Sequence, residues 1–133
     1  TLDVRLEKHE KNAKIIVNFL KKQKKIKEVL YPHKKGSKNY KNWKKYYSGA
    51  SGLLGTVIKS KSKSSVYKFI NSLELFGIGY SWGGFESLAV YQDIQREFHK
   101  YKDKNLHLVR FHIGLEDPKD LIHDIKNSLK HIR

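Results

Sequence analysis

Two stretches of the sequence carry residue types and spacings that could do chemistry. The first is Tyr80-Ser81-Trp82-Gly83-Gly84, whose paired glycines permit unusual backbone angles or the close approach of a ligand. The tryptophan beside them could form a pocket wall while its indole N–H donates a hydrogen bond. The alternative is a plain turn around a buried Trp82, and the local pattern favours that alternative.

The second stretch is the segment Leu106–Ile113, the clearest strand in the sequence. Its alternation places Val109 and Phe111 on one side and Arg110 on the other. Because burying an unpaired cation is costly, Arg110 is expected to have an anionic partner. That partner could be an internal acid such as Glu86, or the carboxylate or phosphate of a substrate, which a planar guanidinium matches in shape. The pattern leaves both open.

The histidines and the remaining acids do not form a metal or acid–base pattern. His107 and His112 are five residues apart on one strand, so they should face opposite sides. Glu116-Asp117 is typical of helix capping. The absence of cysteine excludes disulfides, thiolate metal sites and a cysteine nucleophile. The remaining histidines show no ligand spacing: His9, His33, His99, His123 and His131.

The net charge of +15 comes entirely from the first half of the chain. Residues 1–68 hold 18 lysines and one arginine against four acids, whereas residues 69–133 balance nine basic residues with nine acids. Such asymmetry can indicate an acidic partner, and a small nucleic-acid-binding module using residues 1–68 is the alternative function. The chain has 24 lysines and only four arginines, however, which favours a solvated lysine-rich surface.

Periodicity and turn residues predict the elements that must position these motifs. Helices are expected from the start of the chain to the lysine cluster at 21–25, over 39–47, from 66 to about 75 after a polar break at 60–65, and from 118 onward. A short extended piece is expected at 29–32, and strands are expected at 53–59, 86–90 and 106–113. Gly77 and Gly79 are expected to end the third helix, Asp117 to cap the last, and the segment Gln92 to Asn105 to be irregular or weakly helical. This order suggests an α/β fold, an open sheet with packed helices.

Length and composition restrict the remaining possibilities. With 133 residues and 38% hydrophobic residues, the chain suits one domain with its own core. We find neither an apolar run long enough for a membrane span nor a signal peptide, and we therefore expect a cytoplasmic location. Because the chain begins at Thr1 rather than at a methionine, we expect a processed or excised segment.

Together, the two motifs resemble the Cys/Met-metabolism family of pyridoxal-phosphate (PLP) enzymes, and within it most of all the bacterial cystathionine β-lyases. YSWGGFESL (80–88) is followed some twenty residues later by LVRFHIGLEDPKDLI (108–122), in the family's order and separation. The opening TLDVRLEKHEKNAKIIVNFL resembles the helix that enters the family's C-terminal domain. The segment GSKNYKNWKKYYSGASGLLG resembles its Trp-containing stretch and Gly-rich turn, so the resemblance covers essentially the whole chain.

The resemblance implies a fold and a set of site residues. The fold would be of the α+β type, a mainly antiparallel sheet with helices packed on one side, as in the small C-terminal domain of fold type I PLP enzymes. Residues 1–133 would form that single domain, without the large PLP-binding domain. Arg110 matches the family's arginine that binds the substrate α-carboxylate. Ser81 and Trp82 match residues that help hold that carboxylate or the Schiff-base lysine, and Tyr80 would line the same pocket.

The resemblance also implies an activity and partners. The complete enzyme would cleave cystathionine by α,β-elimination to homocysteine, pyruvate and ammonia, a step of methionine biosynthesis. PLP would be bound by the missing large domain, and no lysine of this chain matches the Schiff-base lysine, so the isolated chain is expected to be inactive. Expected partners are the large domain, a small amino-acid thioether and further copies in a tetramer; we expect no metal, membrane or nucleic acid.

Overall fold

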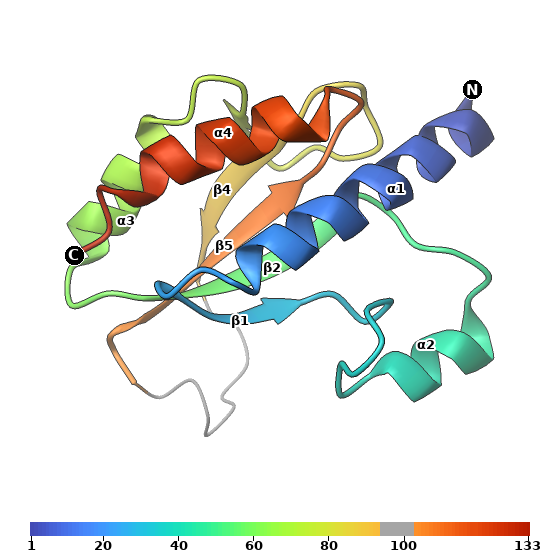
Figure 1. The fold of residues 1–133 in the computed structure, drawn as a ribbon, viewed down its shortest axis with the longest axis horizontal. Coiled ribbons are helices and arrows are strands. Elements are labelled where there is room, and N and C mark those ends of the chain that lie inside the picture. The colour runs from blue at the N-terminus through green and yellow to red at the C-terminus, as the bar shows by residue number, and fades with distance from the viewer. Residues whose placement is uncertain (94–102) are drawn as a thin grey trace.

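The computed structural model describes residues 1–93 and 103–133 (Figure 1). Most of the segment predicted to be irregular, Gln92 to Asn105, falls on residues 94–102, which lie outside the described residues together with His99. The elements in chain order are α1 Leu2–Leu20, β1 Ile26–Leu30, α2 Tyr40–Tyr46, β2 Leu53–Lys59, α3 Lys63–Asn71, β3 Gly77–Ile78, β4 Leu88–Gln92, β5 Leu106–His112 and α4 Pro118–Leu129.

The strands of the described part form one five-stranded sheet in the order β1-β2-β5-β4-β3. Neighbours pair antiparallel except for the short β3, which runs parallel to β4. The mainly antiparallel sheet that the resemblance implied is therefore confirmed. Its central strand is β5, which places Arg110 in the middle of the sheet, between Gly55 of β2 and Val90 of β4.

Helices cover one face of this sheet. In Figure 1, α1 and α4 cross that face and α3 packs beside α4, whereas the short α2 lies away from the sheet. Val109, Phe111 and Ile113 point into this layer and are fully buried, as their alternation predicted. The rings of Phe69 and Phe76 pack edge-on against Phe111. None of the described helices has the length and apolar character that crossing a membrane requires.

The ends of two helices follow the local signals in the sequence. α1 ends at Leu20, directly before the lysine cluster. α4 begins at Pro118, and the Asp117 carboxylate caps it by accepting a hydrogen bond from the backbone N–H of Lys119 at 2.8 Å. Because a proline at the first helical turn has no N–H to satisfy, this start is well defined.

The third helix begins and ends earlier than predicted. It begins at Lys63, inside the predicted polar break, because the Ser62 side chain caps it by accepting a hydrogen bond from the backbone N–H of Ser65. α3 ends at Asn71 rather than near Leu75, and Gly77 belongs to strand β3 instead of terminating the helix. The reason is a tertiary contact: the Asp124 carboxylate of α4 accepts hydrogen bonds from the backbone N–H groups of Glu74 and Leu75 at 2.9 and 2.8 Å. These two amides are therefore bound to another helix, and no local sequence pattern signals that.

The fourth strand begins two residues later than predicted, at Leu88 instead of Glu86. The backbone N–H of Ser87 donates to the Glu116 carboxylate at 2.7 Å, and its carbonyl accepts from Gly77 at 3.0 Å. Ser87 is thus held by side-chain and loop contacts before the sheet ladder starts. The extended piece predicted at 29–32 overlaps only the end of a strand that begins earlier, since β1 spans Ile26–Leu30.

Candidate functional site

Arg110 lies on the face of the sheet opposite the three packed helices and is half-exposed rather than buried. Its Nη2 donates hydrogen bonds to the backbone carbonyls of Tyr80 and Ser81, the latter at 3.1 Å. The guanidinium carbon lies 5.9 Å from the centre of the Tyr80 ring, over its face. No described acid pairs with Arg110, and the ion pair with Glu86 that the sequence left open does not form.

The segment Tyr80–Gly84, which contacts this guanidinium, carries two exposed aromatic side chains. Tyr80 and Trp82 are each 62% exposed, so the interpretation as a plain turn around a buried tryptophan is wrong. Gly83 has a φ of +80°, a conformation that side chains other than glycine rarely adopt. The structure therefore brings Arg110 against the Tyr80 ring and the backbone of Tyr80 and Ser81, with the exposed Trp82 next in the chain.

A hollow of about 300 Å³ lies beside Arg110 on the same face. Gly55 pairs with Arg110 across β2 and β5, and Leu30 of β1 pairs with Gly55. Because Gly55 has no side chain, the sheet surface is depressed at this point, and apolar groups form its walls. The described lining residues are Leu30, Leu53, Leu54, Gly55, Gln92, Leu108 and Arg110.

Glu116 holds the far end of the same loop, a role that the sequence analysis missed. Its carboxylate accepts hydrogen bonds from the Ser87 backbone N–H at 2.7 Å and from the Ser87 hydroxyl at 2.8 Å. The same hydroxyl oxygen accepts from the Gly114 N–H at 2.9 Å. Glu116 is thus a loop anchor, whereas its neighbour Asp117 alone caps the helix. The Glu-Asp pattern could indicate capping, but not this second function.

His9 of α1 and His112 of β5 meet below the loop, although nothing in their spacing predicted it. Their ring centres are 4.8 Å apart in an edge-to-face arrangement, and both face the Gly84 carbonyl. Burial lowers the pKa of His112, and the nearby His9 and Arg110 lower it further, against the opposing effects of the Gly84 carbonyl and of Glu116.

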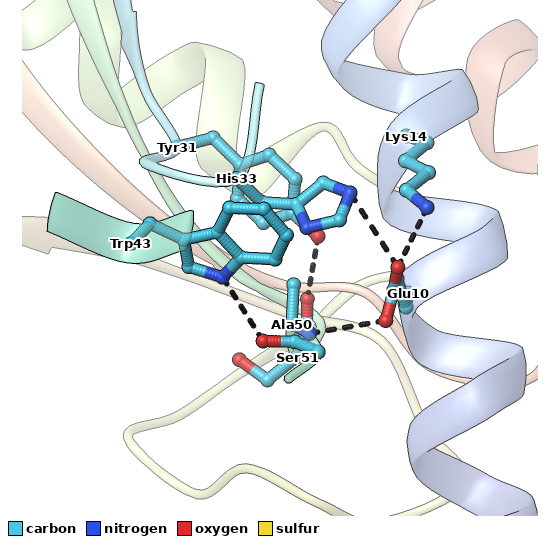
Figure 2. A network of polar contacts seen from close by, with 8 residues as sticks. Glu10, Lys14, Tyr31, His33, Trp43, Ala50 and Ser51 are labelled. Atoms are coloured by element: carbon cyan, nitrogen blue, oxygen red, sulfur yellow. Dashed lines mark hydrogen bonds and ion pairs between the residues drawn. The ribbon is translucent and has the colours of Figure 1, made fainter. Parts of the chain in front are cut away.

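A second polar cluster joins α1 to the segment after β1 (Figure 2). The Glu10 carboxylate accepts from Lys14 Nζ at 2.6 Å and from the Ala50 N–H at 3.0 Å, and it lies 3.4 Å from His33 Nε2. Burial alone would raise the pKa of Glu10, but the contacts with Lys14, Ala50 and His33 lower it overall. Burial and Lys14 lower the pKa of His33, with Glu10 opposing them.

Aromatic residues complete this cluster. The indole of Trp43 packs edge-on against His33 at 4.2 Å and donates to the Gly49 carbonyl at 3.0 Å (Figure 2). The Tyr31 hydroxyl donates to the Ser51 carbonyl at 3.0 Å, and burial raises the pKa of that hydroxyl. These contacts fix the turn that leads into β2, and hence Gly55 opposite Arg110.

The lysines lie away from the Arg110 site. All lysines of residues 1–68 except the half-buried Lys34 are exposed, in agreement with a solvated lysine-rich surface. Among the described residues, no lysine lines the hollow beside Arg110.

Comparison with known proteins gives one consistent family. The sequence profile described as "Cys/Met metabolism PLP-dependent enzyme" matches residues 1–130. A cystathionine β-lyase of Bordetella avium is 35% identical over 131 residues, which cover 97% of this chain and 33% of the relative. An L-alanine/L-glutamate racemase of Wolbachia pipientis is 33% identical over 132 residues, with the same coverage. The chain thus spans about one third of the length of these relatives.

A solved structure shows the same fold. A Campylobacter jejuni protein named as an O-acetylhomoserine (thiol)-lyase, crystallised with N′-pyridoxyl-lysine-5′-monophosphate, superposes with a TM-score of 0.78 at 31% identity. The match covers 96% of this chain and 29% of that protein. The α+β domain is therefore shared with proteins whose names describe different reactions.

Replacing Glu116 with glutamine should destabilise the loop anchor. In Glu116→Gln the side-chain NH₂ faces one of the two Ser87 donors, so that one hydrogen bond is lost. We therefore expect the free energy of unfolding to fall by about 1–3 kcal/mol. Urea unfolding followed by circular dichroism measures the change. Glu74→Gln, which alters an exposed carboxylate, should change stability by less than about 0.5 kcal/mol. Equal effects of the two substitutions would contradict this role of Glu116.

The domain should become less stable as the pH is lowered through the range in which histidine takes up a proton. The pKa values of His33 and His112 are lowered in the folded chain, so the unfolded chain takes up protons first, near pH 6.5. The free energy of unfolding is therefore expected to decrease as the pH drops below about 6.5, until the folded histidines are protonated too. His33→Gln and His112→Gln should each make this decrease shallower in urea unfolding between pH 8 and 5. An unchanged slope in both variants would refute the assignment.

Proposed function

The chain belongs to the Cys/Met metabolism family of PLP-dependent enzymes, and we propose that residues 1–133 form the C-terminal, substrate-binding domain of a cystathionine β-lyase-like enzyme. The observation that carries the proposal is Arg110, a cation that is fixed by main-chain carbonyls but is paired with no described acid. Such a group retains its positive charge for a ligand. An α-carboxylate, with two coplanar oxygens, fits the planar guanidinium.

In this proposal Arg110 binds the substrate carboxylate, and the loop above it completes the pocket. Tyr80 lies against the guanidinium, and Ser81 and Trp82 follow it on the exposed side of the site. Holding the carboxylate at one point fixes the orientation of the substrate's α-carbon, which determines the bond that is cleaved. The half-exposed hollow beside Gly55 leaves room for the ligand next to this anchor.

The proposed reaction is the α,β-elimination of cystathionine, in which water is consumed and homocysteine, pyruvate and ammonia are released. PLP, when bound, supplies the electron sink for carbanion chemistry. This chain contributes binding and orientation, because its site has a fixed cation and no described lysine. The cystathionine β-lyase relative supports this choice among the reactions of the family, and Trp82 supports it because the motif Ser-Trp-Gly-Gly resembles that of the β-lyases.

The large PLP-binding domain is the proposed partner of the open face. Tyr80, Trp82 and Phe85 are all more than 60% exposed, and so is Ile78 on β3, which is typical of a surface that another protein part covers. The chain's one-third share of its relatives' length is consistent with that missing partner. A homo-tetrameric assembly and a cytoplasmic location are part of the same proposal.

Removing the arginine charge tests the proposal in the full-length enzyme that contains this chain. Arg110→Gln should lower kcat/KM for cystathionine by about 10- to 100-fold, since a hydrogen bond to a charged group contributes about 1.5–3 kcal/mol. Most of the effect should appear in KM, because the interaction is made with the ground-state carboxylate. Lys126→Gln, an exposed charge change on α4, serves as the control. An Arg110→Gln enzyme with unchanged KM and kcat would disprove the proposal.

The isolated chain should be catalytically silent. When the 133-residue chain is mixed with PLP and cystathionine, we expect pyruvate to form no faster than with PLP alone, because an activated lysine is needed for the covalent step. Coupled detection of pyruvate measures the rate, and the full-length enzyme is the positive control. A rate that rises with the concentration of the isolated chain would show that the division of roles is wrong.

A further inference from the structure

One stripe of helix α1 presents polar side chains to the backbone of the site. Arg5 Nη1 donates to the Gly83 carbonyl at 3.4 Å, and His9 Nε2 lies 2.9 Å from the Gly84 carbonyl oxygen. Asn12 Nδ2 donates to the carbonyls of Gly114 at 3.0 Å and Glu116 at 2.9 Å. Positions 5, 9 and 12 are four and three residues apart, so they share one face of the helix. α1 thus binds both loops that border the site.

The histidine contacts determine which ring nitrogen carries the proton. A carbonyl oxygen only accepts hydrogen bonds, so the His9 Nε2 that faces Gly84 at 2.9 Å must bear a hydrogen. His112 Nε2 approaches the same oxygen at 3.5 Å. Both side chains are almost fully buried, His9 at 1% and His112 at 2% exposure, and the Nδ1 atoms of both have no partner among the described residues. Each ring therefore has its donor toward the loop and a buried acceptor unused.

Burying polar rings in this way is costly compared with an apolar residue of similar size. The turn they contact has little means of fixing itself, because Gly83 and Gly84 have no side chains and no atom of the described residues lies within 4 Å of where a Cβ would be. Its carbonyls are instead held from two sides. Arg110 binds those of Tyr80 and Ser81, and α1 binds those of Gly83 and Gly84.

We infer that His9 and His112 are positioning residues, which hold the Gly84 carbonyl so that the Tyr80–Trp82 segment stays set over Arg110 in the arrangement that receives a carboxylate. The inference rests on the proposed function for the identity of the ligand, but the positioning itself does not depend on it. It assigns to the buried ring pair a role in substrate affinity that the two residues fulfil without touching the substrate.

The first experiment determines the ring tautomers in the 133-residue chain. At pH 8, where histidine is largely neutral, nitrogen NMR distinguishes protonated from unprotonated ring nitrogens. We expect His9 and His112 to carry the proton on Nε2. A proton on Nδ1 of His9 would overturn the inference, because Nε2 could then not donate to Gly84. This measurement needs no substrate and no variant.

The second experiment removes the donor and follows the loop. In His9→Leu, the backbone order parameters of Gly83 and Gly84 should fall from about 0.85 toward values below about 0.6. His9→Gln should preserve them, because the glutamine amide can place an N–H donor at a similar distance, and Lys8→Gln on the exposed side of α1 is the matched control. Order parameters that stay high in His9→Leu would overturn the inference. If that variant does not fold, the tautomer of His9 in the parent chain is the deciding measurement.

The third experiment links the loop to binding in the full-length enzyme. His9→Leu should raise KM for cystathionine about 3- to 10-fold, and His9→Gln should stay within about twofold of the parent. An unchanged KM in His9→Leu would contradict the positioning role while leaving the proposed function intact. If Arg110→Gln also leaves KM unchanged, the proposed function itself fails, whatever the tautomers and order parameters show.

Discussion

The whole site depends on Arg110 being held by backbone carbonyls instead of by a carboxylate. A carbonyl oxygen satisfies a guanidinium N–H and fixes its direction, but it does not cancel the positive charge. The contacts with Tyr80 and Ser81 therefore leave a cation that is oriented, half-exposed and still able to bind an anion. An internal acid at the same position would have neutralised this cation and turned the site into a structural ion pair.

Such a site needs a loop whose position is fixed by other parts of the fold. Glu116 holds Ser87 at one end of the loop, and the polar stripe of α1 holds the glycine turn near the other end. The helices that support these contacts lie on the opposite face of the sheet, so the face with Arg110 remains accessible (Figure 1). The domain is thus organised as a rigid support for the half-exposed Arg110, which we propose binds an anion.

Local patterns predicted most of the elements and singled out Tyr80–Gly84 and Arg110 as stretches that could do chemistry, because alternation, capping and glycine pairs are properties of short segments. Asp117 and the alternation around Arg110 are examples. The roles of the four proposed site residues came only from the resemblance to the family. Local patterns could not predict contacts between residues that are distant in sequence. The Asp124 carboxylate binds a backbone N–H group that follows α3, and the Glu116 carboxylate binds Ser87. The contact between His9 and His112 is an example, because it joins residues from opposite ends of the chain. The polar residues within the apolar stripe of α1 were the only local signal of that contact.

The most direct test of the account is a crystal structure of the full-length enzyme with an unreactive amino-acid substrate analogue bound. The account predicts that both oxygens of the analogue's carboxylate lie about 3 Å from the guanidinium nitrogens of Arg110, with Tyr80 and Trp82 at the edge of the ligand. A carboxylate bound elsewhere, with Arg110 still facing only the carbonyls of Tyr80 and Ser81, would contradict it.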